Sequence, residues 1–211
     1  MLDITNQLKK SLDFFKNFWE KSITNGLEKS LDLGYNCAMT ILVGIADGKN
    51  VYIGADRAAS DESTIITMCR PKVGVDGKWI YAYAGSVGTG QLLEFVSFPA
   101  IDKKADVYKV LRLNIIKQLK TLVSEHGDDG DDSGAEFLIG ANGKLFEFST
   151  SDWGVVEVSE TCAGSGNQIA LGSLYTTYTL DMSIEDRIKY ALEAAIEYSP
   201  TCQGPVEILS V

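Results

Sequence analysis

The order of strand-like and helix-like segments after residue 39 constrains the fold of this chain more than any other feature. Segments rich in β-branched and aromatic residues predict strands at 40–45, 50–55, 64–68, 79–84, 136–139, 145–148, 155–158 and 206–211. Apolar residues at helical spacing predict helices at 88–97, 106–124, 168–178 and 184–198. Blocks of strands that alternate with pairs of helices favour an α+β fold, in which two antiparallel sheets pack together and helices cover both outer faces.

Two local signals mark the ends of these segments. Asn142-Gly143 separates two strand-like segments and is a strong signal for a hairpin with a type I′ turn. Ser183 precedes the last helical segment and Asp186 follows three residues later, which is the spacing of a capping pair. The sequence therefore predicts a tight hairpin at 142–143 and a helix that begins directly after Ser183.

The composition is that of one cytoplasmic domain. The chain has 211 residues, of which 45% are hydrophobic and 23% charged, enough for one substantial core. Its net charge of −10 argues against a nucleic-acid partner, because binding a nucleic-acid backbone needs a cationic face. The four cysteines form no C-x-x-C pair, which argues against a zinc site and a disulfide-stapled secreted domain. We find neither an apolar run of about 18 residues nor a signal peptide, so we expect no membrane association.

An acidic run at 126–134 contains the clustered oxygen ligands that calcium prefers. It lacks the D-x-D-x-D-G spacing and the distal glutamate of a calcium-binding loop, so we expect a solvated loop and no metal. His126 is the only histidine, which argues against a Ser-His-Asp triad and against histidine-based metal catalysis. We expect no cofactor.

Thr40 begins the first predicted strand, Asp56 follows the second, and Lys72 comes sixteen residues after Asp56. A threonine hydroxyl needs a base, and its own α-amino group can serve once the residue is a chain terminus. An α-amine titrates at about 7.7–8.0, so it can accept a proton near neutral pH. A nearby lysine would keep the amine neutral, and a buried aspartate would compensate the lysine. Taken singly, these residues also suit a strand, a surface turn and a solvated lysine.

Four further segments stand at matching separations from Thr40: G-A-D-R at 54–57, P-K-V at 71–73, A-G-S-V-G at 84–88 and A-G-S-G-N-Q-I-A-L-G at 163–172. With these five motifs the chain resembles the proteasome β-subunit and bacterial proteasome-like peptidase family of N-terminal-nucleophile (Ntn) hydrolases. The resemblance covers residues 40–211, roughly four-fifths of the chain. It implies the family's four-layer α-β-β-α sandwich of two antiparallel sheets.

The resemblance also implies a threonine-type peptidase. In the family's arrangement Thr40 is the nucleophile, its freed amine is the base, and Lys72 sets the electrostatics of the site. Asp56 orients Lys72, the backbone N–H of Gly85 stabilises the oxyanion, and Ser165 helps to position the amine. A serine in a G-S-G turn more often caps the following helix, and one residue can do both.

Five positions match the family's pocket for the P1 side chain of a peptide substrate: Ala59, Arg70, Gly74, Tyr83 and Val87. Arg70 would favour an acidic or polar P1 side chain or turn outward into a subunit contact, whereas Ala59 and Gly74 would leave depth for a larger one. The implied partners are further copies of the chain in a closed ring, and an ATPase unfoldase ring or another assembly component.

Residues 1–39 precede the resemblance and are predicted to be a separate helical extension. Large apolar residues recur every three or four positions there: Ile4, Leu8, Leu12, Phe15, Trp19, Ile23, Leu27 and Leu31. Three roles fit this stripe: a propeptide, a docking helix for a neighbouring subunit, and a membrane-surface helix. Its balanced charge gives only weak attraction to anionic lipid.

The chain departs from the family at two points. Residues 199–205 are S-P-T-C-Q-G-P, where the family has D-x-x-S-G-G, which leaves Ser199 or Thr201 to serve in part. Met39 precedes Thr40, where a family propeptide ends in glycine. These departures favour an alternative function: a catalytically silent ring or assembly component, such as a virion or scaffold part, that docks through residues 1–39.

Overall fold

The computed structural model describes residues 40–60, 64–126 and 134–211. The predicted helical extension at 1–39 and most of the acidic run, residues 127–133, lie outside these ranges. Within the described ranges, no helix has both the length and the apolar composition needed to cross a membrane.

The first sheet has four antiparallel strands with β1 and β2 at its centre. In spatial order they are β10 (Glu160–Ala163), β1 (Leu42–Ala46), β2 (Val51–Ala55) and β11 (Glu207–Ser210). Leu42 of β1 lies opposite Ala55 of β2. This register places the residues just before β1 and just after β2, including Thr40 and Asp56, at the same end of the sheet.

The second sheet is an antiparallel meander in which each strand pairs with the next. Its strands are β5 (Val73–Asp76), β6 (Trp79–Gly85), β7 (Ala135–Ala141), β8 (Lys144–Ser149) and β9 (Val155–Val158). Asn142 and Gly143 join β7 to β8 and have positive φ angles of 51° and 71°. Positive φ at both central positions defines a type I′ turn, so the predicted hairpin is confirmed.

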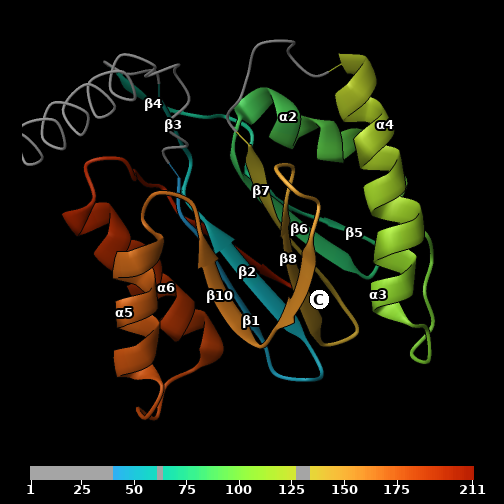
Figure 1. Cartoon of the computed structure of the whole chain (residues 1–211). Helices are drawn as coiled ribbons and strands as arrows, with labels where there is room; N and C mark the ends of the chain where they lie inside the picture. The colour runs from blue at the N-terminus through green and yellow to red at the C-terminus, as the bar shows by residue number, and fades with distance from the viewer. Residues whose placement is uncertain (1–39, 61–63, 127–133) are drawn as a thin grey trace, which may run out of the picture. The chain divides into compact units, whose positions relative to one another are not determined.

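Helices cover the outer faces of both sheets (Figure 1). The first sheet is covered by α5 (Asn167–Thr177) and α6 (Ile184–Tyr198). The second sheet is covered by α2 (Val87–Gln91), the 3₁₀ turn η1 (Leu92–Phe95), α3 (Val107–Val110), the π-helical η2 (Leu111–Ile115) and α4 (Ile116–His126). Ser183 Oγ accepts from Asp186 N at 3.0 Å, so the predicted cap of α6 is also confirmed.

Three clusters of buried apolar side chains lie between these four layers. One cluster joins β1 to Leu192 of α6. A second contains Leu42 and Leu138 and joins the two sheets. A third contains Phe137 of β7 and Leu119 of α4. Because β1 is covered on both faces, its residues are apolar without alternation. The predicted α-β-β-α sandwich of two antiparallel sheets is confirmed.

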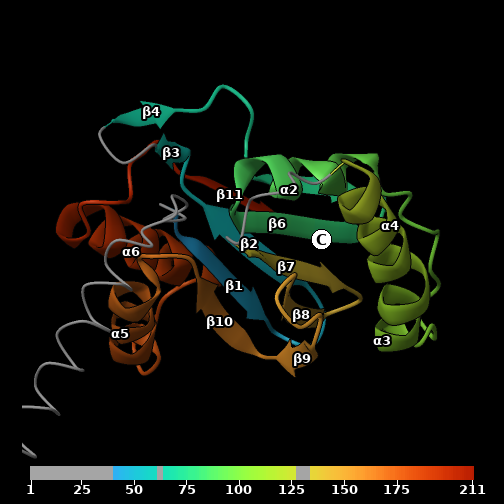
Figure 2. The same cartoon turned by 45° about the horizontal axis from the view of Figure 1, so that its top comes forward.

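The structure differs from the sequence prediction in several elements. The strands β3 (Ala58–Ser60), β5 and β10 were not predicted, because their sequences A-A-S, V-G-V-D and E-T-C-A contain Ala, Gly, Asp and Glu, which have low strand propensity. β3 pairs with β4 (Ile65–Thr67) in a ribbon that lies apart from both sheets (Figure 2). The predicted helices at 88–97 and 106–124 are not continuous α-helices, because η1 and η2 interrupt them.

We expect Leu192→Ala to lower the free energy of unfolding by about 2–5 kcal/mol, because the change leaves a cavity between α6 and the first sheet. Urea unfolding measures this effect. The matched control is Glu193→Ala, at the next and exposed position of the same helix, which should change the unfolding free energy by no more than about 0.5 kcal/mol. Equal effects of the two changes would contradict the layer arrangement.

Candidate active site

Thr40, Asp56 and Lys72 meet at one end of the two sheets. Thr40 lies just before β1 and Asp56 directly after β2, so both come from the first sheet. Lys72 directly precedes β5 of the second sheet. All three are buried, with exposed fractions of 3% for Thr40, 0% for Asp56 and 2% for Lys72. The sequence separations therefore correspond to a real cluster in space.

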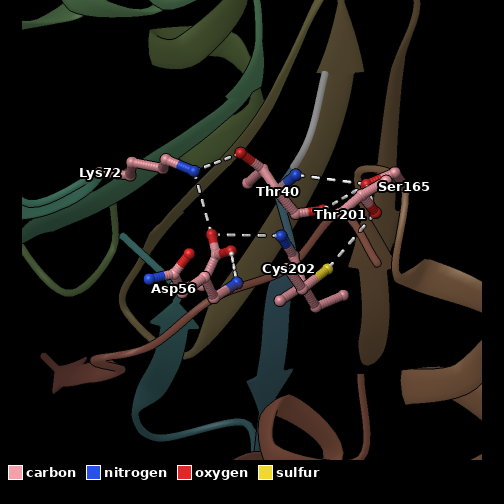
Figure 3. Close-up of polar contacts among 8 residues, drawn as sticks. Thr40, Asp56, Lys72, Ser165, Thr201 and Cys202 are labelled. Atoms are coloured by element: carbon pink, nitrogen blue, oxygen red, sulfur yellow. Dashed lines mark hydrogen bonds and ion pairs between the residues drawn. The ribbon is translucent and has the colours of Figure 1, made fainter. Parts of the chain in front are cut away.

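The Lys72 ammonium group contacts both other residues (Figure 3). Its Nζ donates hydrogen bonds to Thr40 Oγ1 and, at 3.0 Å, to Asp56 Oδ1. Asp56 also accepts from the backbone N–H of Ile41 at 3.3 Å and of Gln203 at 3.2 Å. With three donors around it, the buried carboxylate is well satisfied. Asp56 thus holds both the lysine and the backbone next to Thr40.

Burial acts on the two charges in opposite directions. It lowers the pKa of the Lys72 ammonium group, and the charge of Asp56 opposes this change. It raises the pKa of the Asp56 carboxyl group, while Lys72 and the two backbone N–H groups oppose that change. The charges are therefore interdependent, because removing either one leaves the other buried without its partner.

A chain of hydroxyl groups lies beside the backbone of Thr40, and Figure 3 shows its members Ser165 and Thr201. Thr40 N donates to Ser165 Oγ at 3.3 Å. Ser165 Oγ lies 2.7 Å from Thr201 Oγ1, which in turn lies 2.6 Å from Ser199 Oγ. The Sγ atom of Cys202 is 3.9 Å from Thr201 Oγ1. Ser199 and Thr201, between which the sequence could not choose, are therefore consecutive members of one chain.

The turn that carries Ser165 packs against the Thr40 backbone. Gly164 has a φ of +90°, and a Cβ atom there would lie 2.4 Å from Thr40 O, so this position requires glycine. The N-cap of α5 is Gly166, with no side-chain capping bond. Ser165 therefore bonds to Thr40 and Thr201 and does not cap the helix, which makes the capping interpretation of G-S-G wrong.

Glu136, at the second position of β7, also reaches this turn and was not among the predicted site residues. Its Oε2 accepts a hydrogen bond from Gly164 N at 2.7 Å. A glutamate near the start of a strand resembles any solvent-facing charge in a sequence. Only the packing of the two sheets brings it to the turn beside Thr40.

Three other matched positions, Tyr83, Gly85 and Val87, lie in β6 or at the start of α2. Gly85 ends β6 and directly precedes Ser86, the N-cap of α2, while Val87 begins that helix. Tyr83 is buried in β6, and burial together with the nearby charge of Glu94 raises the pKa of Tyr83 to about 12. Its hydroxyl therefore stays protonated at neutral pH.

The structure modifies two expectations about the P1 pocket, those for Arg70 and for Gly74. Arg70 forms an ion pair with Glu94 of η1 at 2.5 Å, so its charge already has a partner. A Cβ atom on Gly74 would lie 2.7 Å from the ring of Tyr81, so this ring fills the depth expected beside Gly74. Ala59 lies in the β3–β4 ribbon.

Sequence relatives identify the family of this chain. It is 33% identical over 160 residues to proteasome subunit beta 1 of Thermococcus onnurineus, covering 74% of this chain and 78% of the relative. It is 32% identical over 161 residues to proteasome subunit beta 1 of Thermococcus kodakarensis, with the same coverage. The chain belongs to the proteasome β-subunit family. No protein-family model matches it.

Solved structures agree with this membership at the level of the fold. The chain is similar to Thiobacillus denitrificans BPH in complex with epoxomicin, with a TM-score of 0.68 and 19% identity over 82% of this chain and 98% of that one. It is also similar to eukaryotic HslV from Trypanosoma brucei, with a TM-score of 0.60 and 15% identity over 81% and 98% of the two chains. The chain therefore has the Ntn-hydrolase fold of its family.

For this family member we expect Asp56→Ala to lower the free energy of unfolding by roughly 3–5 kcal/mol, because it leaves the buried Lys72 cation without its partner. Thermal or urea unfolding measures the change. The matched control is Glu157→Ala, which breaks the half-exposed Lys144–Glu157 pair and should cost less than about 1 kcal/mol. A cost for Asp56→Ala no larger than that of the control would contradict the buried pair.

Proposed function

We propose that this member of the proteasome β-subunit family is a threonine-type endopeptidase, with Thr40 as the nucleophile once its amine is exposed. The observation that supports the proposal most directly is the hydrogen bond from the buried Lys72 ammonium group to Thr40 Oγ1. A cation at this hydroxyl favours its deprotonated form and therefore nucleophilic attack.

The base becomes available only when Thr40 is the first residue, because Thr40 N is a peptide amide in the full-length chain. The freed amine then takes the proton from Oγ1 while Oγ1 attacks the scissile carbonyl carbon. The protonated amine donates this proton to the leaving nitrogen as the C–N bond breaks, which leaves an ester on Thr40. A water molecule, deprotonated by the same amine, hydrolyses the ester and regenerates the site.

The remaining matched residues have supporting roles in this proposal. The Gly85 N–H stabilises the oxyanion of the tetrahedral intermediate. Ser165, whose Oγ lies 3.3 Å from Thr40 N, orients the amine. Asp56 keeps Lys72 charged and directed at the hydroxyl. Because these groups act together in one step, their separate effects on kcat should not be additive.

The P1 pocket remains part of the proposal, with Ala59, Arg70, Gly74, Tyr83 and Val87 as its matched positions. The ion pair to Glu94 means that Arg70 would bind an acidic P1 side chain only by exchanging one carboxylate for another. We therefore expect a weaker preference for acidic P1 residues than an unpaired arginine would produce.

In the proposed assembly, residues 40–211 form the peptidase domain of a cytoplasmic, homo-oligomeric ring. Residues 1–39 serve as a propeptide or docking segment, and an ATPase unfoldase ring or other assembly component is a candidate partner. Heterologous contacts between neighbouring subunits form a closed ring when the rotation from one subunit to the next closes, and an open filament when it does not. The substrate class is peptide.

One observation favours a catalytically silent ring or scaffold component instead. The 199–205 segment, where the family has an aspartate and a serine, contacts Ser165 through uncharged hydroxyls: Thr201 Oγ1 lies 2.7 Å from Ser165 Oγ and 2.6 Å from Ser199 Oγ. A silent component would keep the fold and the ion pair but would not hydrolyse peptides.

The first functional prediction concerns the N-terminus of the active protein. We expect the mature chain to begin at Thr40, because only a free amine can act as the base. Release occurs by attack of the Thr40 hydroxyl on the preceding carbonyl, or by translation from Met39 followed by removal of that methionine. Intact mass spectrometry of an assembled, peptide-cleaving preparation measures this. Full-length chains alone in such a preparation would refute the mechanism.

The second functional prediction is that Thr40→Ala abolishes peptide hydrolysis without changing the fold, because the change removes the nucleophile and little packing. Fluorogenic peptide turnover and the thermal unfolding midpoint are the two measurements. Thr40→Ser is the matched control, since it retains a hydroxyl and should keep measurable turnover. Undiminished turnover by Thr40→Ala would locate the activity at another site.

A further inference from the structure

Glu136 connects the second sheet to the turn beside the nucleophile. It lies in β7 opposite Ala84 of β6, and Leu138, two positions further on the same face, belongs to the core between the sheets. Its carboxylate therefore faces the first sheet, where Oε2 accepts from Gly164 N at 2.7 Å. Hydrogen bonds to an ionised acceptor at this distance are roughly twice as strong as neutral ones.

The turn held by Glu136 determines the position of both polar groups of the Thr40 backbone. Gly164 packs so closely against Thr40 that an added Cβ atom would lie 2.4 Å from Thr40 O, and Gly166 N donates to the same oxygen at 3.4 Å. Ser165, between these two glycines, accepts from Thr40 N at 3.3 Å. A movement of this turn would therefore displace the carbonyl and the nitrogen of Thr40 together.

Thr201 holds only one side of the turn. It contacts the Ser165 side chain at 2.7 Å and comes from the segment after α6. Glu136 holds the backbone of the preceding residue and comes from the opposite sheet. Two contacts from different layers fix the position of the Ser165 hydroxyl more closely than one contact could.

We propose that Glu136 is a positioning residue for the reaction: it holds the Gly164–Ser165 turn so that Ser165 can orient the Thr40 amine. This inference rests on the proposed peptidase function for its effect on kcat. Its structural part, the coupling of Glu136 to the Thr40 backbone through the turn, holds with or without catalysis.

The test compares Glu136 with a second glutamate in an equivalent place. Glu147 of β8 also crosses from the second sheet to the first, where its Oε2 accepts from Thr161 Oγ1 at 2.5 Å. Both glutamates are half-buried, but the Glu147 contact is at the start of β10, away from Thr40. Glu147→Ala is therefore the matched control for loss of a bond between the sheets.

The first measurement is hydrogen–deuterium exchange of the Gly166 amide, which donates to Thr40 O. Exchange should become faster in Glu136→Ala and stay unchanged in Glu147→Ala. Glu136→Gln should retain the wild-type rate, because its amide oxygen can still accept from Gly164 N. If Glu136→Ala does not fold, Glu136→Asp, whose shorter side chain cannot reach the same point, replaces it in every arm.

The second measurement is steady-state hydrolysis of a fluorogenic peptide. We expect kcat to fall on the order of 10-fold to 100-fold in Glu136→Ala with KM unchanged, because misorientation of a reacting group affects the chemical step. Glu136→Gln should restore kcat, and Glu147→Ala should leave it at the wild-type value. Glu136→Ala should lower kcat by a smaller factor in the Ser165→Ala background than in the wild type, because the two changes share the path through the Ser165 hydroxyl.

The outcomes separate this inference from the proposed function. An unchanged Gly166 exchange rate in Glu136→Ala overturns the positioning role whether or not the protein hydrolyses peptides. Equal loss of kcat in Glu136→Ala and Glu147→Ala also overturns it, because the loss would then reflect general destabilisation. A wild-type protein without turnover refutes the peptidase proposal alone, and the exchange rates then decide the role of Glu136.

Discussion

The buried ion pair between Lys72 and Asp56 is the interaction on which the rest of the site depends. Lys72 comes from the second sheet and Asp56 from the first, so the pair forms only when the sheets pack at their observed register. Moving β2 by one residue relative to β1 would turn its side chains to the opposite face. The packing of the two sheets therefore also determines where Lys72 meets Thr40.

Burying this ion pair costs free energy, because both charged groups lose their contacts with water. Apolar side chains of similar volume are often as stabilising as a buried ion pair, or more so. Lys72, however, also donates to Thr40 Oγ1, which no apolar side chain could do. The two backbone donors on Asp56 offset part of its desolvation and tie the pair to the segments beside Thr40 and Thr201. The desolvation cost therefore falls on an ion pair whose cation also contacts the Thr40 hydroxyl.

Sequence patterns predicted the elements whose formation depends mainly on residues close together in the chain. The long strands, α5, α6, the turn at Asn142 and the cap at Ser183 follow from periodicity and turn chemistry. The contact between Asp56 and Lys72 was implied by the resemblance to the family, in which the aspartate orients the lysine, and the structure places the two side chains 3.0 Å apart. The contact of Glu136 with the turn at Gly164 could not be predicted, since it depends on how two sheets face each other. The ion pair of Arg70 with Glu94 joins segments whose relative position is likewise set by packing.

The hydroxyl chain at Ser165, Thr201 and Ser199 has a property that a carboxylate lacks: each member can donate or accept. Beside a peptide nitrogen, which carries one hydrogen, Ser165 must accept, as it does here. Beside a free amine, which carries two or three hydrogens, the same hydroxyl can still accept, so the lone pair of a neutral amine stays available for the base role proposed above. The Ser165 proton can then go to Thr201 Oγ1 or Thr40 O, which lie 2.7 Å and 3.4 Å from Ser165 Oγ. The same contacts therefore suit both a peptide nitrogen and a terminal amine at residue 40.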